Sequence, residues 1–116
     1  MNATIDISTL STPRMLPHIN ALVKKQLAPQ TVAIDRRGVY PADFMSSLGD
    51  AQGYQHHLPS LNQNGPNFSQ AIDVMQTVSR ECMSTGFCVW CQDALGWYIE
   101  HADEASVRDH WLPRVG

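Results

Sequence analysis

Charged residues are scarce in this sequence of 116 residues. Asp, Glu, Lys and Arg make up 16% of it, and the formal net charge is −3. Globular domains ordinarily contain about 25% charged residues. Adjacent basic residues occur only at Lys24-Lys25 and Arg36-Arg37. Because nucleic-acid-binding proteins gather Lys and Arg in a patch or stripe, we expect no nucleic acid among the partners.

Long hydrophobic runs are also missing. No stretch of about 18 uncharged apolar residues is present, so we expect no membrane-spanning helix. The first residues do not combine a basic segment with an apolar one, as a secretory signal peptide does. The three cysteines are an odd number and lie among apolar residues, which favours free thiols in a reducing compartment. We therefore expect a cytoplasmic protein.

Strand-like alternation of apolar and polar residues is absent, whereas helical spacing recurs along most of the chain. The sequence therefore predicts an all-α fold of about five helices, arranged around a buried fourth helix at about 85–100. The first dozen residues are mostly small or polar. Residues 1–12 are expected to form an N-terminal arm, and residues 13–116 a single helical domain.

Proline, glycine and asparagine set the expected ends of the helices. Pro29 should end or bend the first helix because proline lacks an N–H, and Gly38 is suited to cap its continuation. Asn67 is a good N-cap for the third helix. A final short helix should be capped by Asp103 and stopped by Pro113.

The expected buried faces follow from apolar spacing. A stripe on the third helix has offsets of three and four, which is typical of a core-facing side: Phe68, Ile72, Met75, Ser79 and Cys82. The fourth helix is apolar nearly all round, so it should be buried on most sides. Asp93 is the only formal charge in its middle. We expect a structural carboxylate there, either hydrogen-bonded or exposed at an edge, because a buried charge needs a partner.

A Cys-x-x-Cys pair, Cys88 to Cys91, lies in this apolar helix. No strand precedes it, as one does in thioredoxin-like redox sites. Zinc needs four ligands, and no second Cys-x-x-Cys or His pair with regular spacing completes a set. We expect no metal and buried, packed thiols. A metal or redox protein that uses Cys82, Cys88 and Cys91 stays open as the third alternative.

Acid–base and nucleophilic motifs are missing as well. The scattered carboxylates fall mostly at helix ends or on exposed faces, and there is no glycine-rich phosphate loop or nucleophile elbow. His56 and His57 lie in a polar loop at 54–66 and are expected to be solvated. The residues therefore predict a helical module with no catalytic residue of its own.

The order of three segments resembles the N-terminal helical domain of the acyl-CoA dehydrogenase family. IDRRGVYPADFMSSLGDAQGY (34–54) resembles the opening helix pair, and IDVMQTVSRECMSTGFCVWCQDALGWYI (72–99) the next two helices, which join at Ser-Thr-Gly. ADEASVRDHWLPRVG (102–116) resembles the short helix that closes the domain. The loop between the first two segments departs from the family pattern, of which only Pro59 is kept.

This resemblance implies part of an FAD-dependent oxidoreductase of lipid metabolism. Family enzymes remove hydrogen from the α,β-carbons of an acyl-CoA or other acyl thioester. Their flavin-binding β-domain and C-terminal helical domain, which supply the catalytic base and most FAD contacts, are expected to be absent here. This domain would cover one side of the acyl tunnel, and the resemblance places Cys88, Gln92 and Leu95 along it. We expect the chain alone to be inactive and not to bind FAD.

A second reading is a free-standing helical interaction module or a split-subunit partner without flavin. Under either reading, an uncovered apolar helical surface predicts a homo- or hetero-oligomer. The enzyme part ranks first and the interaction module second.

Overall fold

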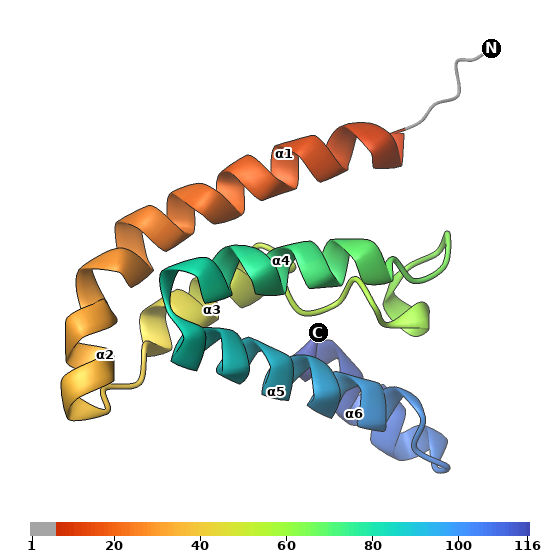
Figure 1. Cartoon of the computed structure of the whole chain (residues 1–116). Coiled ribbons are helices and arrows are strands. Elements are labelled where there is room, and N and C mark those ends of the chain that lie inside the picture. The colour runs from red at the N-terminus through yellow and green to blue at the C-terminus, as the bar shows by residue number, and fades with distance from the viewer. Residues whose placement is uncertain (1–6) are drawn as a thin grey trace.

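The computed structural model describes the backbone of residues 7–116 and the side chains of residues 15–116. These residues form no strand, so the predicted all-α class is confirmed. The helices are α1 (Ile7–Leu22), α2 (Thr31–Arg37), α3 (Ala42–Asp50), α4 (Phe68–Glu81), α5 (Met83–Glu100) and α6 (Ala105–Val115) (Figure 1). No helix in the described part is long and apolar enough to cross a membrane.

The first predicted helix is one bent rod. Its α-helical part, α1, begins at Ile7, inside the stretch predicted as an arm, while residues 1–6 lie outside the described residues. A π-helical turn (Val23–Leu27) and a 3₁₀ turn (Ala28–Gln30) then connect α1 to α2. Pro29 lies in the 3₁₀ turn, and its missing N–H and fixed ring disfavour regular α-helix there. The predicted bend is confirmed; the arm boundary at residue 12 stays a prediction.

Two predicted caps are present. Gly38 follows α2 in the left-handed conformation, with φ of 65°, and its N–H donates to the Ile34 carbonyl oxygen at 3.1 Å. Glycine adopts this conformation without the steric cost of a side chain. The Asn67 side chain accepts a hydrogen bond from the Gln70 N–H at 3.0 Å and begins α4. Both caps fix where the neighbouring loops leave the helices.

The main core lies where α1, the bend, α3, α4 and α5 meet. Its fully buried side chains are Ile19, Leu27, Phe44, Leu48, Val74, Val78 and Val89. On α4 the buried residues are Ala71, Val74 and Val78. The predicted stripe is therefore wrong, because Phe68 and Ile72 are 51% and 56% exposed. The smaller side chains face the core and let the helices approach closely, whereas the larger ones lie on an adjacent face.

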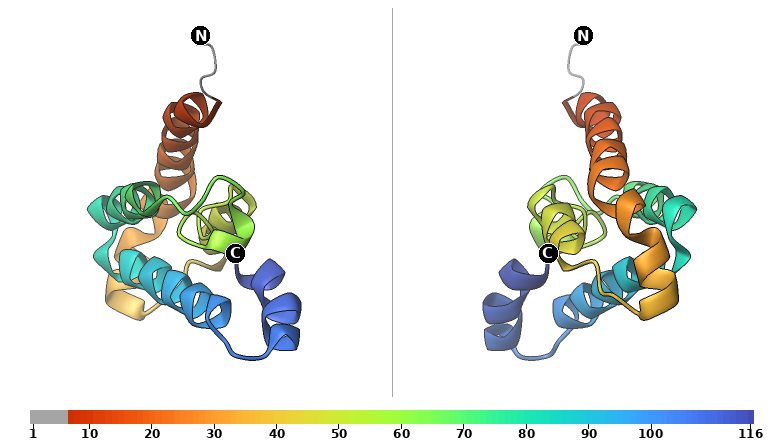
Figure 2. Two further views of the ribbon diagram at one scale, coloured as in Figure 1. Left: turned by 90° about the vertical axis from the view of Figure 1, so that its right-hand side faces the viewer. Right: turned by 90° about the vertical axis from the view of Figure 1, so that its left-hand side faces the viewer.

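The end of the chain forms a smaller core. α6 packs against α5, and Leu58 from the loop before α4 is buried with Leu112 and Val115. Figure 2 shows α6 beside α5, with the C-terminus close to that loop. The predicted cap and stop of this helix are both wrong. Glu104, not Asp103, precedes α6, and Pro113 lies inside its last turn, where the missing N–H removes one i→i−4 hydrogen bond without ending the helix.

Helix α5 is covered on one face only. It lies between α4 and α6, and its buried residues are Thr85, Gly86, Val89, Asp93 and Gly96. Several large side chains of α5 are exposed: Phe87, Trp90, Leu95, Trp97 and Tyr98. The described residues therefore do not bury α5 on most sides, although the sequence predicts such burial. Small residues on the covered face allow close packing, and the bulky ones are left outside.

Candidate functional site

A cavity of about 340 Å³ lies between α4 and α5. The first turns of α4 and the second half of α5 form its walls, and the loop before α4 contributes one residue. The lining residues are His57, Phe68, Ala71, Ile72, Met75, Trp90, Asp93, Ala94, Trp97 and Tyr98. On each helix these positions recur at every turn, singly or as adjacent pairs, so one continuous stripe of each helix faces the cavity. Three residues of the stripe that was predicted to face the core, Phe68, Ile72 and Met75, line this cavity instead.

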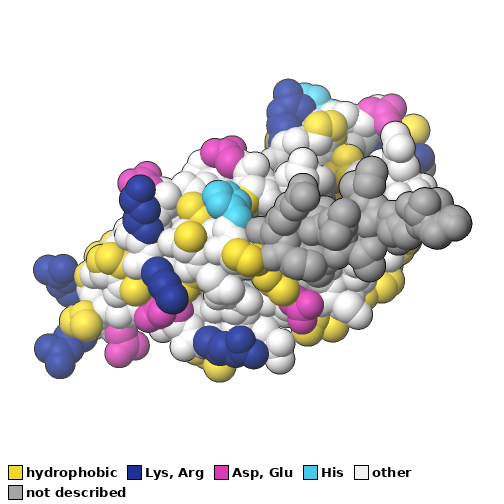
Figure 3. Space-filling view, turned by 90° about the horizontal axis from the view of Figure 1, so that it is seen from above, with side chains coloured by type: hydrophobic (Ala, Val, Ile, Leu, Met, Phe, Trp, Pro, Cys, Tyr) yellow, Lys and Arg dark blue, Asp and Glu magenta, His cyan; other side chains and the backbone are white. Residues whose placement is uncertain are grey.

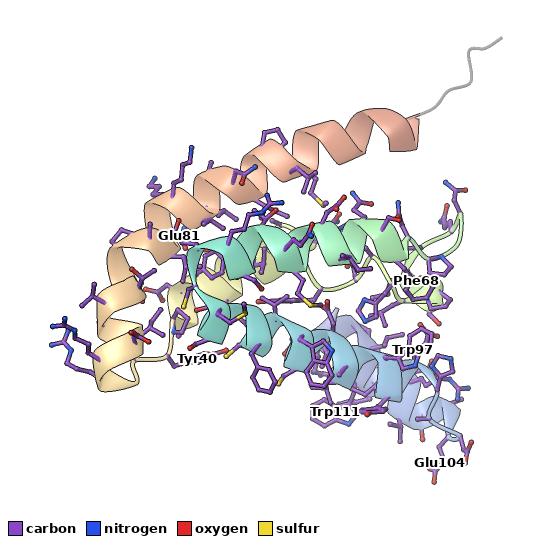
Figure 4. All side chains as sticks on the ribbon, viewed as in Figure 1. Tyr40, Phe68, Glu81, Trp97, Glu104 and Trp111 are labelled. Carbon is purple, nitrogen blue, oxygen red and sulfur yellow. The ribbon has the colours of Figure 1, made fainter. Side chains whose placement is uncertain are left out.

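Aromatic rings dominate the walls. Phe68 meets Trp97 edge to face, with ring centroids 5.9 Å apart, and Figure 4 shows the pair near one end of α4 and α5. His57 stacks on the same indole at 6.3 Å, and His101 contacts it at 4.2 Å. The distances to Phe68 and His57 fall within the usual range for attractive ring pairs, about 4.5–7 Å, and the ring of His101 lies closer still. Trp97 is therefore held in place by three other rings.

His57 is buried at the edge of this cavity. Its Nε2 lies 2.7 Å from the main-chain carbonyl oxygen of Asp93. Because a carbonyl oxygen only accepts, Nε2 must carry the hydrogen. The other ring nitrogen, Nδ1, is buried and has no partner in the described residues, which leaves it as an acceptor when the ring is neutral.

The prediction of a solvated histidine pair is wrong, because His56 is also buried. Burial, and to a lesser extent the neighbouring His57, lowers the pKa of His56. The loop that carries both residues is tied down by its backbone. The Asn67 N–H donates to the His56 carbonyl oxygen at 2.7 Å, and Asn62 Nδ2 donates to that of Leu58 at 2.8 Å. Polar composition alone did not reveal that this loop lies against α5.

Asp93 is the acidic group of the site. Its side chain is only 7% exposed, and Oδ1 has no hydrogen-bond partner in the described residues. Burial without a compensating partner raises the pKa of this carboxyl from 3.8 to about 7. Tyr54 is buried nearby; burial raises its pKa most, and the charges of Tyr40 and Asp93 raise it further. Within the described residues, the hydrogen bond expected for this carboxylate is therefore missing at Oδ1.

The residues expected to line an acyl tunnel lie apart from this cavity. Cys88 packs against the main core. Gln92 Nε2 donates to the Val115 carbonyl oxygen at 2.9 Å, which directs Gln92 toward α6. Leu95 is 45% exposed. None of the three lines the α4–α5 cavity, and their contact with an acyl chain stays a prediction.

The cysteines are free thiols. Cys82 and Cys88 are partly buried, whereas the prediction of a buried thiol is wrong for Cys91, which is exposed. Thr85 Oγ1 donates to Cys82 Sγ at 3.1 Å. Burial, with smaller effects of Cys91 and Cys82, raises the pKa of the Cys88 thiol. Within the described residues no three His, Cys, Asp or Glu side chains gather as a metal site would require.

Surface charge is dispersed on the face seen in Figure 3. Lys and Arg side chains alternate there with acidic, neutral and apolar ones. The described residues on this face therefore form no basic patch of the kind that binds nucleic acid.

Comparison with known proteins gives one match. The sequence model of the N-terminal domain of acyl-CoA dehydrogenases matches residues 14–116. No curated protein and no solved structure matches the chain. The matched residues include α2 to α6 in full, with the loop that carries His56 and His57.

Proposed function

Because this chain belongs to the acyl-CoA dehydrogenase family, we propose that it is the N-terminal helical domain of an FAD-dependent acyl-CoA dehydrogenase-like oxidoreductase. In the complete reaction, hydrogen would leave the α,β-carbons of an acyl thioester. This domain would cover one side of the acyl tunnel. The match over residues 14–116 carries the proposal. We assign the catalytic base to no residue of the described part.

The α4–α5 cavity does not fit FAD. The α4–α5 cavity of about 340 Å³ contains no Lys or Arg in its lining. FAD carries an anionic diphosphate, which protein sites usually bind with basic side chains or a glycine-rich turn at a helix N-terminus. We derive no flavin step from these residues.

The exposed aromatic side of α5 supports a role as one wall of a larger assembly. Phe87 and Trp90 stack with ring centroids 5.7 Å apart, although they are 62% and 51% exposed. Tyr98 is 73% exposed. Apolar surface gathered in this way is ordinarily covered by other protein or by a ligand. The three free thiols support a cytoplasmic location for that assembly.

The acyl-facing role of Cys88, Gln92 and Leu95 belongs to the same proposal. Cys88 packs on the core and Gln92 is bonded to Val115. Leu95 is the most exposed of the three, so an acyl chain can reach it without displacing a contact. We therefore propose Leu95 as the position at which chain-length preference is most sensitive.

The test begins with the protein isolated from its own cells under non-denaturing conditions. We expect flavin absorbance to co-purify with this chain, and acyl-CoA to be oxidised when an artificial electron acceptor is added. Leu95→Trp should shift the preferred acyl length toward shorter chains, whereas Val107→Trp on α6 should not. Absence of flavin and of acyl-CoA oxidation from every complex that contains the chain would overturn the proposal.

The second candidate is a helical interaction module or split-subunit partner without flavin. The exposed Phe87–Trp90 pair favours a protein partner under this reading as well. A stable, colourless homo- or hetero-oligomer in the same purification would support it.

A further inference from the structure

The α4–α5 cavity combines aromatic walls with one buried acid, a combination that the acyl-thioester role does not use. We propose that this cavity binds a small hydrophobic primary amine in its protonated form, with the ammonium group on the Asp93 carboxylate and the hydrocarbon part against Trp90 and Trp97. This inference does not rest on the proposed dehydrogenase function, and its test uses no flavin.

The size and walls of the cavity suit such a ligand. Its volume of about 340 Å³ lies at the lower end of the range for small-molecule sites, about 300–1,000 Å³. Phe68, Ile72 and Met75 close one side from α4, and the indoles of Trp90 and Trp97 stand on the other. An alkyl or phenyl group would remove this apolar surface from water. Indole faces also attract cations.

Asp93 lies between the two indoles on the same face of α5. The spacing of three residues from Trp90 and four to Trp97 places all three side chains on one side of a helix. The lining contains no Lys or Arg, so nothing in it neutralises the acid. Oδ1 of Asp93 is buried without a hydrogen-bond partner in the described residues. A cation is therefore the group that would best compensate the buried carboxylate.

His57 adds a second acceptor to the same lining. Its Nε2 hydrogen is used by the Asp93 carbonyl oxygen, which leaves Nδ1 as an unpartnered acceptor. A primary ammonium group has three N–H donors, whereas a quaternary ammonium group has none. The site should thus prefer primary amines to their trimethylated counterparts. Carboxylate ligands should be excluded, because they would bring a second negative charge beside Asp93.

Binding should depend on pH because Asp93 must be ionised to hold the cation. The titratable groups around it are His57 and Tyr54 from the loop and Tyr98 on α5, while α4 contributes only apolar residues to the lining. Burial raises the pKa of Asp93 to about 7. Affinity should therefore rise about tenfold between pH 6 and pH 8, as the carboxyl loses its proton.

The decisive experiment is titration calorimetry on the 116-residue chain. The probes are n-hexylammonium, its neutral analogue hexan-1-ol, hexanoate and hexyltrimethylammonium. The protein variants are Asp93→Asn and, as the matched control, Asp109→Asn on the exposed side of α6. We expect n-hexylammonium to bind at least about tenfold more tightly than hexan-1-ol, since a charge-assisted bond is roughly twice as strong as a neutral one. Asp93→Asn should abolish this preference, and Asp109→Asn should leave it unchanged.

A second measurement locates the ligand. Indole N–H resonances of Trp90 and Trp97 should shift on addition of n-hexylammonium, while that of Trp111 on α6 should not. Trp90→Ala keeps the carboxylate and should weaken binding of both the amine and the alcohol. Equal affinity for n-hexylammonium and hexan-1-ol, amine binding that survives Asp93→Asn, or no amine binding at pH 8 would each overturn the proposal.

Discussion

Gly86 on α5 lies directly against Ser79 on α4. A Cβ atom added to Gly86 would overlap the Ser79 hydroxyl oxygen and would come within 2.8 Å of Ser79 Cβ and 3.0 Å of its Cα. Gly86→Ala should therefore lower the free energy of unfolding by about 1–3 kcal/mol, as measured by urea denaturation. Ser79→Gly in the same chain should restore part of that loss.

A control for this substitution is Gly38→Ala. No atom lies within 4 Å of a Cβ added there, so its cost comes only from the left-handed backbone. It should be about 1 kcal/mol, and Ser79→Gly should not relieve it. If Ser79→Gly rescued neither substitution, the α4–α5 contact would not be the cause of the loss at Gly86.

The contribution of Asp93 to stability should fall as pH rises through the acidic and neutral range. Burial raises the pKa of Asp93 from 3.8 to about 7 in the folded chain. Between these two values the folded state holds a proton that the unfolded state has released, so the free energy of unfolding falls with pH. The loss attributable to Asp93 should reach about 4 kcal/mol and level off above pH 7. Denaturant unfolding at a series of pH values measures it.

Asp93→Asn separates this carboxyl from the other titrating groups. The substitution keeps the shape of the side chain and removes its charge. The variant should be more stable than the natural chain at pH 8 and should show a flatter pH dependence between pH 4 and pH 7. Parallel pH profiles for the two proteins would mean that Asp93 does not titrate as its burial requires.

The Asn67 cap should contribute measurably to stability. Its side chain accepts the Gln70 N–H at 3.0 Å, and Asn67→Ala leaves that group without this partner. We expect a loss of about 1 kcal/mol in the free energy of unfolding. Asn64→Ala, in the exposed loop just before the cap, should change it by less than about 0.5 kcal/mol. Equal effects of the two substitutions would argue against a capping role.

The three thiols should react at different rates. Cys91 is exposed, whereas Cys88 is partly buried and burial raises its thiol pKa. Because the thiolate is the reactive form, iodoacetamide should modify Cys91 first, as followed by intact-mass spectrometry. Zinc should protect none of them. If zinc protected two or more thiols from iodoacetamide, or if a reversible Cys88–Cys91 disulfide formed, the metal or redox alternative would be supported instead.

Self-association should depend on the exposed aromatic pair on α5. Replacing Phe87 and Trp90 together by Ser removes two stacked rings from the surface. Sedimentation velocity should show less association for this variant, with little change in helical content. Replacing Val32 and Tyr40, which are 64% and 58% exposed elsewhere on the chain, provides the control. A strictly monomeric natural chain would contradict the prediction.

Local chemistry was enough to place some of the helix boundaries. Pro29, Gly38 and Asn67 act through their own rings, backbone and side chains, so the sequence predicts the bend and two caps directly. Pro113 misled the prediction because proline removes only one i→i−4 hydrogen bond from the last turn, while packing against α5 holds α6 in place. The family resemblance was likewise readable from the order of three segments.

Tertiary packing decided the rest. Two adjacent faces of α4 carry apolar residues, and the docking of α1 and α5 selects Ala71, Val74 and Val78 as the buried set. Asp93 stood out in the sequence as an isolated charge on an apolar helix. Its neighbour His57 did not, because nothing in a polar loop indicates that the loop will fold back onto α5 and lie 2.7 Å from Asp93.

The thinness of the fold has a thermodynamic consequence. The Cα atoms span only 18 Å along the shortest axis, which is about the thickness of two packed helices. Many apolar side chains are therefore already exposed to solvent in the folded state. Unfolding then exposes little additional apolar surface, which makes its heat-capacity change small for a chain of this length. The stability curve of such a chain is broad and shallow with temperature. A protein surface that covered the solvent-exposed face of α5 would increase the apolar area exposed on unfolding. Scanning calorimetry of the complex would then show a larger heat-capacity change of unfolding than that of the chain alone.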